Sequence, residues 1–242
     1  MSAFKKSAAS FKTVIIAFCL FSVAHAQQIP DNYKLLYEQD FEGDVSLNDF
    51  EISDFKAWKI GKGKDGKVLE LYGKSRYIPQ YRSPLNIAFI KDKKFGNFIL
   101  EADLQQTGKE YGHRDLCLFF GIKDPANYYY THMASKADPN AHNIFLVNDA
   151  PRTNIASRTT EGIDWGDTEE WHKVRLERNI DTGIIKVFIN DMSKPVIEAE
   201  DKHFNLGYIG FGSFDDTGKI DNIKIWGPSL APEKKGFFET SY

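Results

Sequence analysis

Histidine, tyrosine and arginine side chains in the middle of this 242-residue chain are the ones best suited to chemistry. The segment 128–133 places polar-tipped rings at every second position, at Tyr128, Tyr130 and His132. Successive residues of a β-strand point to opposite faces, so these rings share one face and the intervening residues share the other. The intervening residues are Tyr129, Thr131 and Met133. Rings with polar tips are costly to bury without hydrogen-bond partners, so we expect the first set on an open, concave face and the second set in the core.

Two neighbouring segments should add polar side chains to that face. One begins with His113 and Arg114, and the other begins with His142. The loop 123–127 has the length and composition of a hairpin turn, which would bring His132 close to His113 or Arg114. The same residue types also have a structural interpretation, because aromatic rows on strands commonly pack against neighbouring strands.

A cluster of histidine, tyrosine and arginine without paired carboxylates indicates β-elimination from a uronic acid. An arginine would neutralise the sugar carboxylate and acidify the proton at C5. A neutral histidine or a tyrosinate would remove that proton, and a tyrosine would protonate the leaving oxygen. The predicted catalytic residues are His132, Tyr130, His142 and Arg114. A sugar leaving group would make the reaction a lyase reaction, a hydroxyl would make it a dehydration, and both stay open.

A second set of residues is predicted to bind the substrate. Its members are Arg82, His113, Tyr128, Arg152 and Trp165. Arg82 and Arg152 are included because the planar guanidinium fork suits carboxylates and sulfates. Trp165, in the segment 163–167, is included as a groove wall on which a sugar ring could stack.

Short runs with a period of two, and almost no helical periodicity, follow residue 26. About a dozen runs are expected to be strands: Lys34–Gln39, Lys67–Tyr72, Ile87–Lys91, Phe98–Gln105, Asp115–Ile122, Tyr128–Met133, Asn143–Val147, His172–Glu177, Ile184–Asn190, Val196–Glu200, Gly207–Ser213 and Ile220–Trp226. Asp-Gly and other glycine-bearing turns between them suit antiparallel hairpins. We therefore predict an all-β, two-sheet antiparallel β-sandwich of the jelly-roll type, in one domain over 27–227 with a C-terminal tail over 228–242.

The first 26 residues have the three parts of a secretory signal peptide. Lysines without any acidic residue come first, followed by the apolar run 14–23 and the small-x-small motif Ala24-His25-Ala26. That run is too short to cross a bilayer, which needs about 20 residues. We expect cleavage after Ala26 and a periplasmic, cell-surface or secreted protein without a membrane span, with a retained anchor as the alternative.

The mature chain would be mildly acidic. Removal of three lysines changes the formal net charge from −3 to about −6. This charge argues against nucleic acid and against an anionic membrane surface as partners. Only Cys117 would remain, which excludes an internal disulfide and suggests a core residue.

Four motifs follow one another in a familiar order. The turn Phe41-Glu42-Gly43 comes first, and the strand 171–176, with the sequence Trp-His-Lys-Val-Arg-Leu, comes later. The glycine-rich run 207–212 and the segment 220–225, Ile-Asp-Asn-Ile-Lys-Ile, complete the series. This succession resembles the concanavalin A-like lectin/glucanase superfamily over nearly all of the mature chain. The resemblance implies two stacked antiparallel sheets with carbohydrate lying across the concave face.

The resemblance also implies a structural Ca²⁺ between the early turn and the last strand. Glu42, Asp221 and Asp40 are the predicted ligands, because calcium prefers hard oxygen ligands. The alternative is that these carboxylates are solvated turn residues.

Glucanases of this fold carry a closely spaced motif, roughly E-x-D-x-x-E, on one strand. Glu101 and Asp103 alternate correctly here but lack a third carboxylate, which disfavours hydrolysis by paired carboxylates. In residue type the histidine, tyrosine and arginine set is similar to that of jelly-roll polysaccharide lyases. We therefore predict an exported, monomeric enzyme that acts by β-elimination on an acidic polysaccharide or oligosaccharide, without an organic cofactor. The alternatives are a non-catalytic carbohydrate-binding module, a glycoside hydrolase on the same fold and a structural envelope protein.

Overall fold

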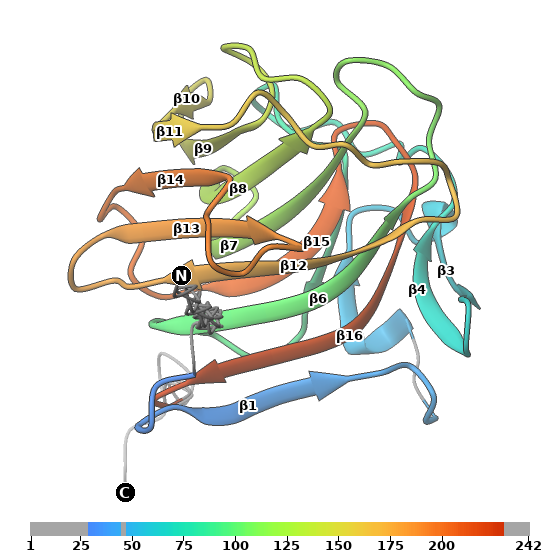
Figure 1. The fold of residues 1–242 in the computed structure, drawn as a ribbon, viewed down its shortest axis with the longest axis horizontal. Helices are drawn as coiled ribbons and strands as arrows, with labels where there is room; N and C mark the ends of the chain where they lie inside the picture. The colour runs from blue at the N-terminus through green and yellow to red at the C-terminus, as the bar shows by residue number, and fades with distance from the viewer. Residues whose placement is uncertain (1–28, 45–46, 230–242) are drawn as a thin grey trace, which may run out of the picture.

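Two stacked antiparallel sheets form the protein in the computed structural model, which describes residues 29–44 and 47–229 (Figure 1). The predicted signal peptide and the tail from residue 230 lie outside the described residues. Helical structure in the described ranges is limited to two short 3-10 turns, η1 (Leu47–Asp49) and η2 (Phe55–Ala57). None of the helices described is long and apolar enough to cross a membrane.

The nine-stranded sheet has the order β11-β14-β13-β12-β6-β16-β4-β3, and β1 also pairs with β16. Its strands are β1 (Lys34–Gln39), β3 (Trp58–Lys62), β4 (Lys67–Leu71), β6 (Phe98–Gln106), β11 (Ala156–Thr159), β12 (Trp171–Arg178), β13 (Ile184–Ile189), β14 (Ile197–Glu200) and β16 (Gly218–Gly227). Strand β16 changes partner along its length, from β4 at residues 218–220 to β1 at residues 223–227. Its register against β6 shifts between Asp221 and Lys224, and Asn222 has a φ of 49°. This β-bulge redirects side chains at the point where the partner changes.

The seven-stranded sheet has the order β10-β9-β8-β7-β15-β5-β2. Its strands are β2 (Phe50–Ile52), β5 (Asn86–Ile90), β7 (Asp115–Asp124), β8 (Asn127–Ala134), β9 (Asn143–Asn148), β10 (Thr153–Asn154) and β15 (Tyr208–Ser213). Strands β7 and β8 pair as the predicted hairpin, with Cys117 opposite His132. The all-β, two-sheet antiparallel jelly roll predicted from the sequence is confirmed.

Alternate residues of facing strands fill the space between the two sheets. Leu100 and Leu104 of β6 belong to the same buried cluster as Leu118 of β7 and Tyr129 and Met133 of β8. Full burial of one such side chain contributes about 1.5–3 kcal/mol, so this shared layer holds the sheets together. The prediction that Tyr129 and Met133 face the core is confirmed.

The opposite face of β8 is covered, although we expected it to be open. Tyr128, Tyr130 and His132 are only 2%, 0% and 3% exposed. The two tyrosines belong to a second buried cluster, and Tyr81 from the connection between β4 and β5 packs against it. The expectation is wrong because this connection, 72–85, supplies a cover that periodicity within one strand does not reveal.

The glycine-rich run of β15 reflects close packing inside the seven-stranded sheet. Strand β15 lies between β7 and β5. A Cβ at Gly212 would lie 1.8 Å from the carbonyl oxygen of Asn86, and one at Gly210 would lie 2.8 Å from the Cβ of Phe89. Glycine is therefore needed at these positions for the strands to approach each other.

Candidate functional site

A small pocket opens on the outer face of the seven-stranded sheet, beside the start of β7 and the end of β8. Its volume is about 170 Å³. It is lined by Arg82, Tyr111, His113, His132, Asn140, Arg152, Phe214 and Asp215. We call it the cationic pocket, because two arginines and two histidines line it together with one carboxylate. Four of the predicted site residues meet here: Arg82, His113, His132 and Arg152.

Two guanidinium groups dominate this pocket. Arg152 donates from Nη1 to the hydroxyl oxygen of Tyr130 at 2.5 Å and from Nη2 to the carbonyl oxygen of Asn140 at 3.1 Å. The guanidinium carbons of Arg152 and Arg82 lie 5.2 and 5.4 Å from the ring centroid of Phe214. Within residues 29–44 and 47–229, the arginines paired with a carboxylate within 4.0 Å are Arg158 and Arg175. Arg82 and Arg152 thus have no described carboxylate within 4.0 Å, although Asp215 lines the same pocket.

His132 is held in one orientation at the floor of the pocket. Its Nδ1 lies 2.9 Å from the carbonyl oxygen of Asn140, so Nδ1 carries the proton and donates it. Its Nε2 lies 3.5 Å from Oδ2 of Asp115 and has no hydrogen-bond partner of good geometry among the described residues. The ring of His113 lies 6.5 Å from that of His132, as the hairpin predicted, and its Nε2 lies 2.5 Å from Oδ2 of Asp138.

Sequence reasoning missed the buried carboxylate beneath this histidine. Asp115 is 0% exposed. Its carboxylate accepts from the Ser213 hydroxyl at 2.9 Å, the Cys117 thiol at 3.0 Å and the Phe214 N–H at 3.1 Å. Burial alone would raise the pKa of Asp115, but the charge of His132 and these hydrogen bonds outweigh burial and hold the pKa below its ordinary value. Asp115 therefore provides a fixed negative charge beside His132.

A second carboxylate, Asp216, lies against the first and behaves differently. Its Oδ2 accepts from the backbone N–H of Asp115 and from the Tyr111 hydroxyl, both at 2.9 Å. Burial, followed by the charge of Asp115, raises the pKa of Asp216 to about 7. Because two adjacent negative charges repel each other, one carboxylate of such a pair is expected to keep its proton.

The raised pKa of Asp216 should make stability depend on pH. Folded Asp216 keeps its proton up to about pH 7, whereas the unfolded chain releases it near pH 4. The free energy of unfolding should therefore fall as the pH rises through this window. The variant Asp216→Asn can still accept both hydrogen bonds and should lose this part of the pH dependence. Urea denaturation of both proteins across the window measures the difference, and parallel curves would contradict it.

Arg114, predicted to be catalytic, lies outside the pocket. It is 3% exposed and donates to the side-chain oxygen of Gln106 at 2.7 Å, to the Gln106 carbonyl at 3.0 Å and to the Gly166 carbonyl at 2.8 Å. These three acceptors direct its guanidinium towards the end of β6 and the loop before β12. The predicted grouping of Arg114 with Tyr130 and His132 in one open groove is not found, and Arg152 occupies the expected position.

The other predicted residues are buried at or near the same face. His142 is 0% exposed, its Nε2 lies 3.0 Å from the hydroxyl oxygen of Thr160, and burial lowers its pKa to about 4. It is therefore neutral, and it does not line the cationic pocket. Tyr130 lies beneath the pocket as the partner of Arg152, and burial raises the pKa of its hydroxyl.

Trp165 is a core residue and not the predicted groove wall. It is 1% exposed and belongs to the cluster between the sheets. Its Nε1 donates to the carbonyl oxygen of Met133 at 3.2 Å, and its ring stands edge-on to His172 at 5.1 Å. Both faces of the indole are therefore unavailable to a sugar.

A second pocket, of about 360 Å³, lies further along the same face of the seven-stranded sheet. Its aromatic lining residues are Tyr77, Phe89, Phe119, Tyr128 and Tyr208. We call it the aromatic pocket. Tyr128 and His132 are four residues apart on β8, which corresponds to about 13 Å along a strand, so the two pockets are neighbours.

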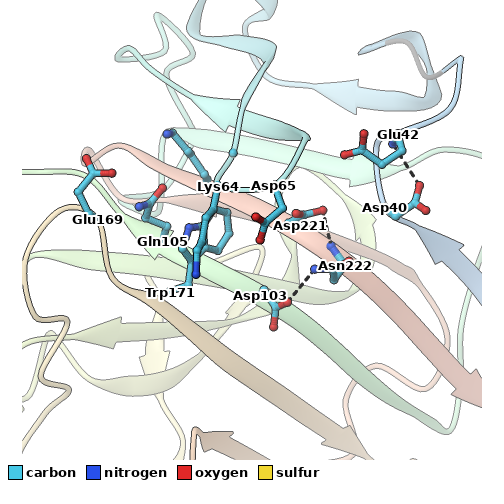
Figure 2. Close-up of a pocket in the computed structure, with 12 residues that line it drawn as sticks. Asp40, Glu42, Lys64, Asp65, Asp103, Gln105, Glu169, Trp171, Asp221 and Asn222 are labelled. Atoms are coloured by element: carbon cyan, nitrogen blue, oxygen red, sulfur yellow. Dashed lines mark hydrogen bonds between the residues drawn. The ribbon is translucent and has the colours of Figure 1, made fainter.

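The predicted calcium ligands line a groove on the outer face of the other sheet. This acidic groove, of about 830 Å³, carries six carboxylates: Asp40, Glu42, Asp65, Asp103, Glu169 and Asp221. Figure 2 shows Asp65, Asp103 and Asp221 near its middle, with Asp40 and Glu42 at one end and Glu169 at the other. Burial, together with the charges of Asp103, Glu42 and Asp40, raises the pKa of Asp221 to about 6. The groove is therefore strongly negative.

The carboxylates of Asp40, Glu42 and Asp221 are not arranged around one ion. Each already accepts a backbone N–H, from Glu42 at 3.1 Å, from Lys67 at 2.7 Å and from Asn222 at 2.7 Å respectively. Ligands of one calcium ion lie 2.3–2.6 Å from it, and so within about 5 Å of one another. The predicted ligands do not meet this condition. Among the described residues, the three carboxylates whose oxygens all lie within 4.8 Å of one another are those of Asp115, Asp215 and Asp216. In this arrangement Asp40, Glu42 and Asp221 do not fit the predicted calcium site.

Comparison with known proteins identifies the fold. Neither a protein-family model nor a curated protein sequence matches this chain. The winged bean acidic lectin in complex with methyl-α-D-galactose matches with a TM-score of 0.54 and 13% identity, covering 82% of this chain and 99% of the lectin. The fold is a jelly roll shared with this lectin. The carbohydrate-binding module CBM66 from Bacillus subtilis shares it at a TM-score of 0.52 and 19% identity, over 74% of this chain and 96% of the module.

Another similar structure is a putative glycosyl hydrolase from Parabacteroides distasonis, with a TM-score of 0.50 and 15% identity over 78% of this chain and 98% of that chain. Binding proteins and a putative enzyme thus share this jelly roll. Identities this low establish the fold, and the function depends on the protein's own side chains.

Proposed function

We propose that this protein binds carbohydrate and that its cationic pocket recognises the carboxylate of an acidic sugar. The observation that supports this function is the pair of guanidinium groups, Arg82 and Arg152, that line one pocket without a described carboxylate within 4.0 Å. Arg152 is half-buried, and buried or half-buried charges normally have partners of opposite sign. A ligand carboxylate would supply that partner.

Arg152 is preorganised for such a contact. Its planar group packs 4.4 Å over the ring of Phe145 and is fixed by Tyr130 and Asn140. A guanidinium that is already oriented loses little conformational entropy on binding, and its fork matches a carboxylate. His113 and His132 line the same opening, but Nδ1 of His132 already donates to Asn140, so the two guanidinium groups would be the main donors to the anion.

The size of the pocket limits how much of a glycan it can hold. Its volume of about 170 Å³ is below the roughly 300–1,000 Å³ of ordinary ligand pockets. It therefore suits one charged sugar residue at the end of a chain. The aromatic pocket nearby would contact the next part of the ligand.

Calorimetric titration tests this proposal directly. Oligosaccharides ending in a uronic acid should bind with one-to-one stoichiometry, and affinity should fall with added salt because the contact is ionic. Neutral oligosaccharides of equal length should bind at least about tenfold more weakly, which is the effect of losing one charged hydrogen bond. Equal affinity for the neutral and acidic ligands would refute the proposal.

A second candidate function, β-elimination from the bound uronate, is favoured by the state of His132. Its Nδ1 donates to the carbonyl oxygen of Asn140, and its Nε2 is buried and lacks a hydrogen-bond partner among the described residues. For elimination a neutral His132 would have to turn Nε2 from Asp115 into the pocket, where this nitrogen would take the proton at C5 while the C4–O bond breaks and a C4–C5 double bond forms. Because burial raises the pKa of Tyr130, its hydroxyl could donate a proton to the leaving oxygen but could not act as the base.

The two candidates differ in whether the ligand changes. Elimination creates an unsaturated uronate that absorbs in the ultraviolet, and His132→Gln should abolish this signal. A binding protein returns the ligand unchanged. Export through the predicted signal peptide would place either activity in the periplasm, at the cell surface or outside the cell.

A further inference from the structure

The acidic groove lies on the opposite side of the sandwich from the cationic pocket. Strand β16 changes partner here, Asp221 lies opposite Asp103 of β6 in the ladder, and Asn222 in the bulge that follows donates from Nδ2 to the Asp103 carboxylate at 2.8 Å. The β3–β4 hairpin adds Lys64 and Asp65 (Figure 2). Residues far apart in the chain are thus brought together around one open concavity.

The charge of the groove indicates which ligands it would repel. Its lining contains six carboxylates and two lysines, Lys64 and Lys219. Such a surface repels the acidic sugar proposed for the other face and attracts cations. The remaining polar groups must then decide which kind of cation fits.

Gln105 provides independent evidence that the groove is a ligand site. It is 2% exposed and lines the groove from β6. Its Oε1 has no hydrogen-bond partner among the residues described. A buried acceptor without a donor is unfavourable, so a ligand that brings an N–H or O–H group would satisfy it.

Trp171 supplies an aromatic wall next to this acceptor. It begins β12 directly opposite Gln105 in the ladder, lines the groove and is only partly buried. An indole attracts cations over its face and can also pack against the apolar face of a sugar ring. An isolated metal ion would use neither the ring nor the volume of about 830 Å³, which is typical of organic ligands.

We propose that the acidic groove binds an oligosaccharide that bears free ammonium groups, that is, an amino sugar chain without N-acetylation. Its ammonium groups would pair with Asp103 and Asp221, and a hydroxyl or ammonium would donate to Gln105. A sugar ring would pack on Trp171. The protein would then hold a cationic glycan on one face and an acidic one on the other.

Titration with glucosamine oligomers tests this proposal on the full chain. A glucosamine tetramer should bind, and the N-acetylated tetramer of the same length should bind at least about tenfold more weakly because it carries no ammonium groups. Spermidine presents the charges without the rings and should also bind more weakly. Affinity for the acetylated tetramer or for spermidine equal to that for the glucosamine tetramer would overturn the proposal, as would the absence of binding.

Paired variants locate the site. Asp103→Asn with Asp221→Asn removes two charges and keeps both side-chain shapes, and it should weaken binding of the glucosamine tetramer by at least about tenfold. Glu198→Gln, which removes a carboxylate paired with Arg158 outside the groove, is the matched control and should have no effect. Unchanged binding in the double variant, or complete displacement of the tetramer by millimolar calcium, would contradict a sugar site. Arg152→Gln should leave this binding intact, which separates the test from that of the cationic pocket.

Discussion

Replacing Arg152 by glutamine should weaken the binding of a uronate-ended oligosaccharide by about 10–100-fold. A hydrogen bond to a charged group contributes about 1.5–3 kcal/mol, and each 1.4 kcal/mol is a factor of ten in affinity. Glutamine keeps a polar group near Tyr130 but loses both the charge and the planar fork that would contact the carboxylate. Isothermal titration calorimetry at low ionic strength measures the change.

Arg158 is the matched control for this variant. It is an exposed arginine on β11, paired with Glu198 at 2.6 Å and separate from the cationic pocket. Arg158→Gln should leave the affinity unchanged, because exposed ion pairs of this kind contribute little and no ligand contact is involved. An Arg152→Gln protein that binds like the unmodified protein would assign recognition to another surface.

Arg82 should contribute less than Arg152. It is exposed, and its only described contact is the ring of Phe214, which Arg152 shares. Because both guanidiniums would face one anion, their effects should not add. A double variant that is no weaker than Arg152→Gln alone would show that Arg152 supplies most of the ionic contact.

Periodicity predicted the parts of the structure that depend on local backbone geometry. The period-two runs identified most strands, and the division of β8 into Tyr129 and Met133 on one face and Tyr130 and His132 on the other is what the structure shows. Strand geometry forces this alternation whatever the rest of the chain does. The fold class and the hairpin between β7 and β8 could therefore be derived from the sequence.

The same reasoning could not show which face was open. Tyr81 of the connection 72–85 packs against the cluster that contains Tyr128 and Tyr130, Arg152 contacts the Tyr130 hydroxyl, and both contacts depend on tertiary packing and not on any local pattern. Arg114 illustrates a related problem. It stands one residue before β7 begins, where strand alternation no longer fixes the direction of a side chain, and its acceptors come from Gln106 and Gly166.

The carboxylate pair beneath His132 depends on a non-local contact. Asp115 and Asp216 are 101 residues apart in the chain and meet because β15 pairs with β7. One signal was present in the sequence. Asp115 shares a strand face with Cys117 and Phe119, and a carboxylate in an apolar row is rarely buried unless it has specific partners. That alternation could have marked Asp115 as a buried charge, although not its partners.

Trp165→Ala should lower the free energy of unfolding by about 3–5 kcal/mol, the cost of deleting a fully buried tryptophan. The indole fills space between the sheets and satisfies the Met133 carbonyl, so its removal leaves both a cavity and an unpaired acceptor. For a domain of this size the melting temperature should fall by about 6–20 °C. Trp171→Ala, six residues away in the chain but only partly buried at the acidic groove, should cost much less stability and should instead weaken binding of the glucosamine tetramer. If Trp165→Ala melted like the unmodified protein and lost sugar affinity, the groove-wall interpretation would be restored and the packing assigned to Trp165 would be wrong.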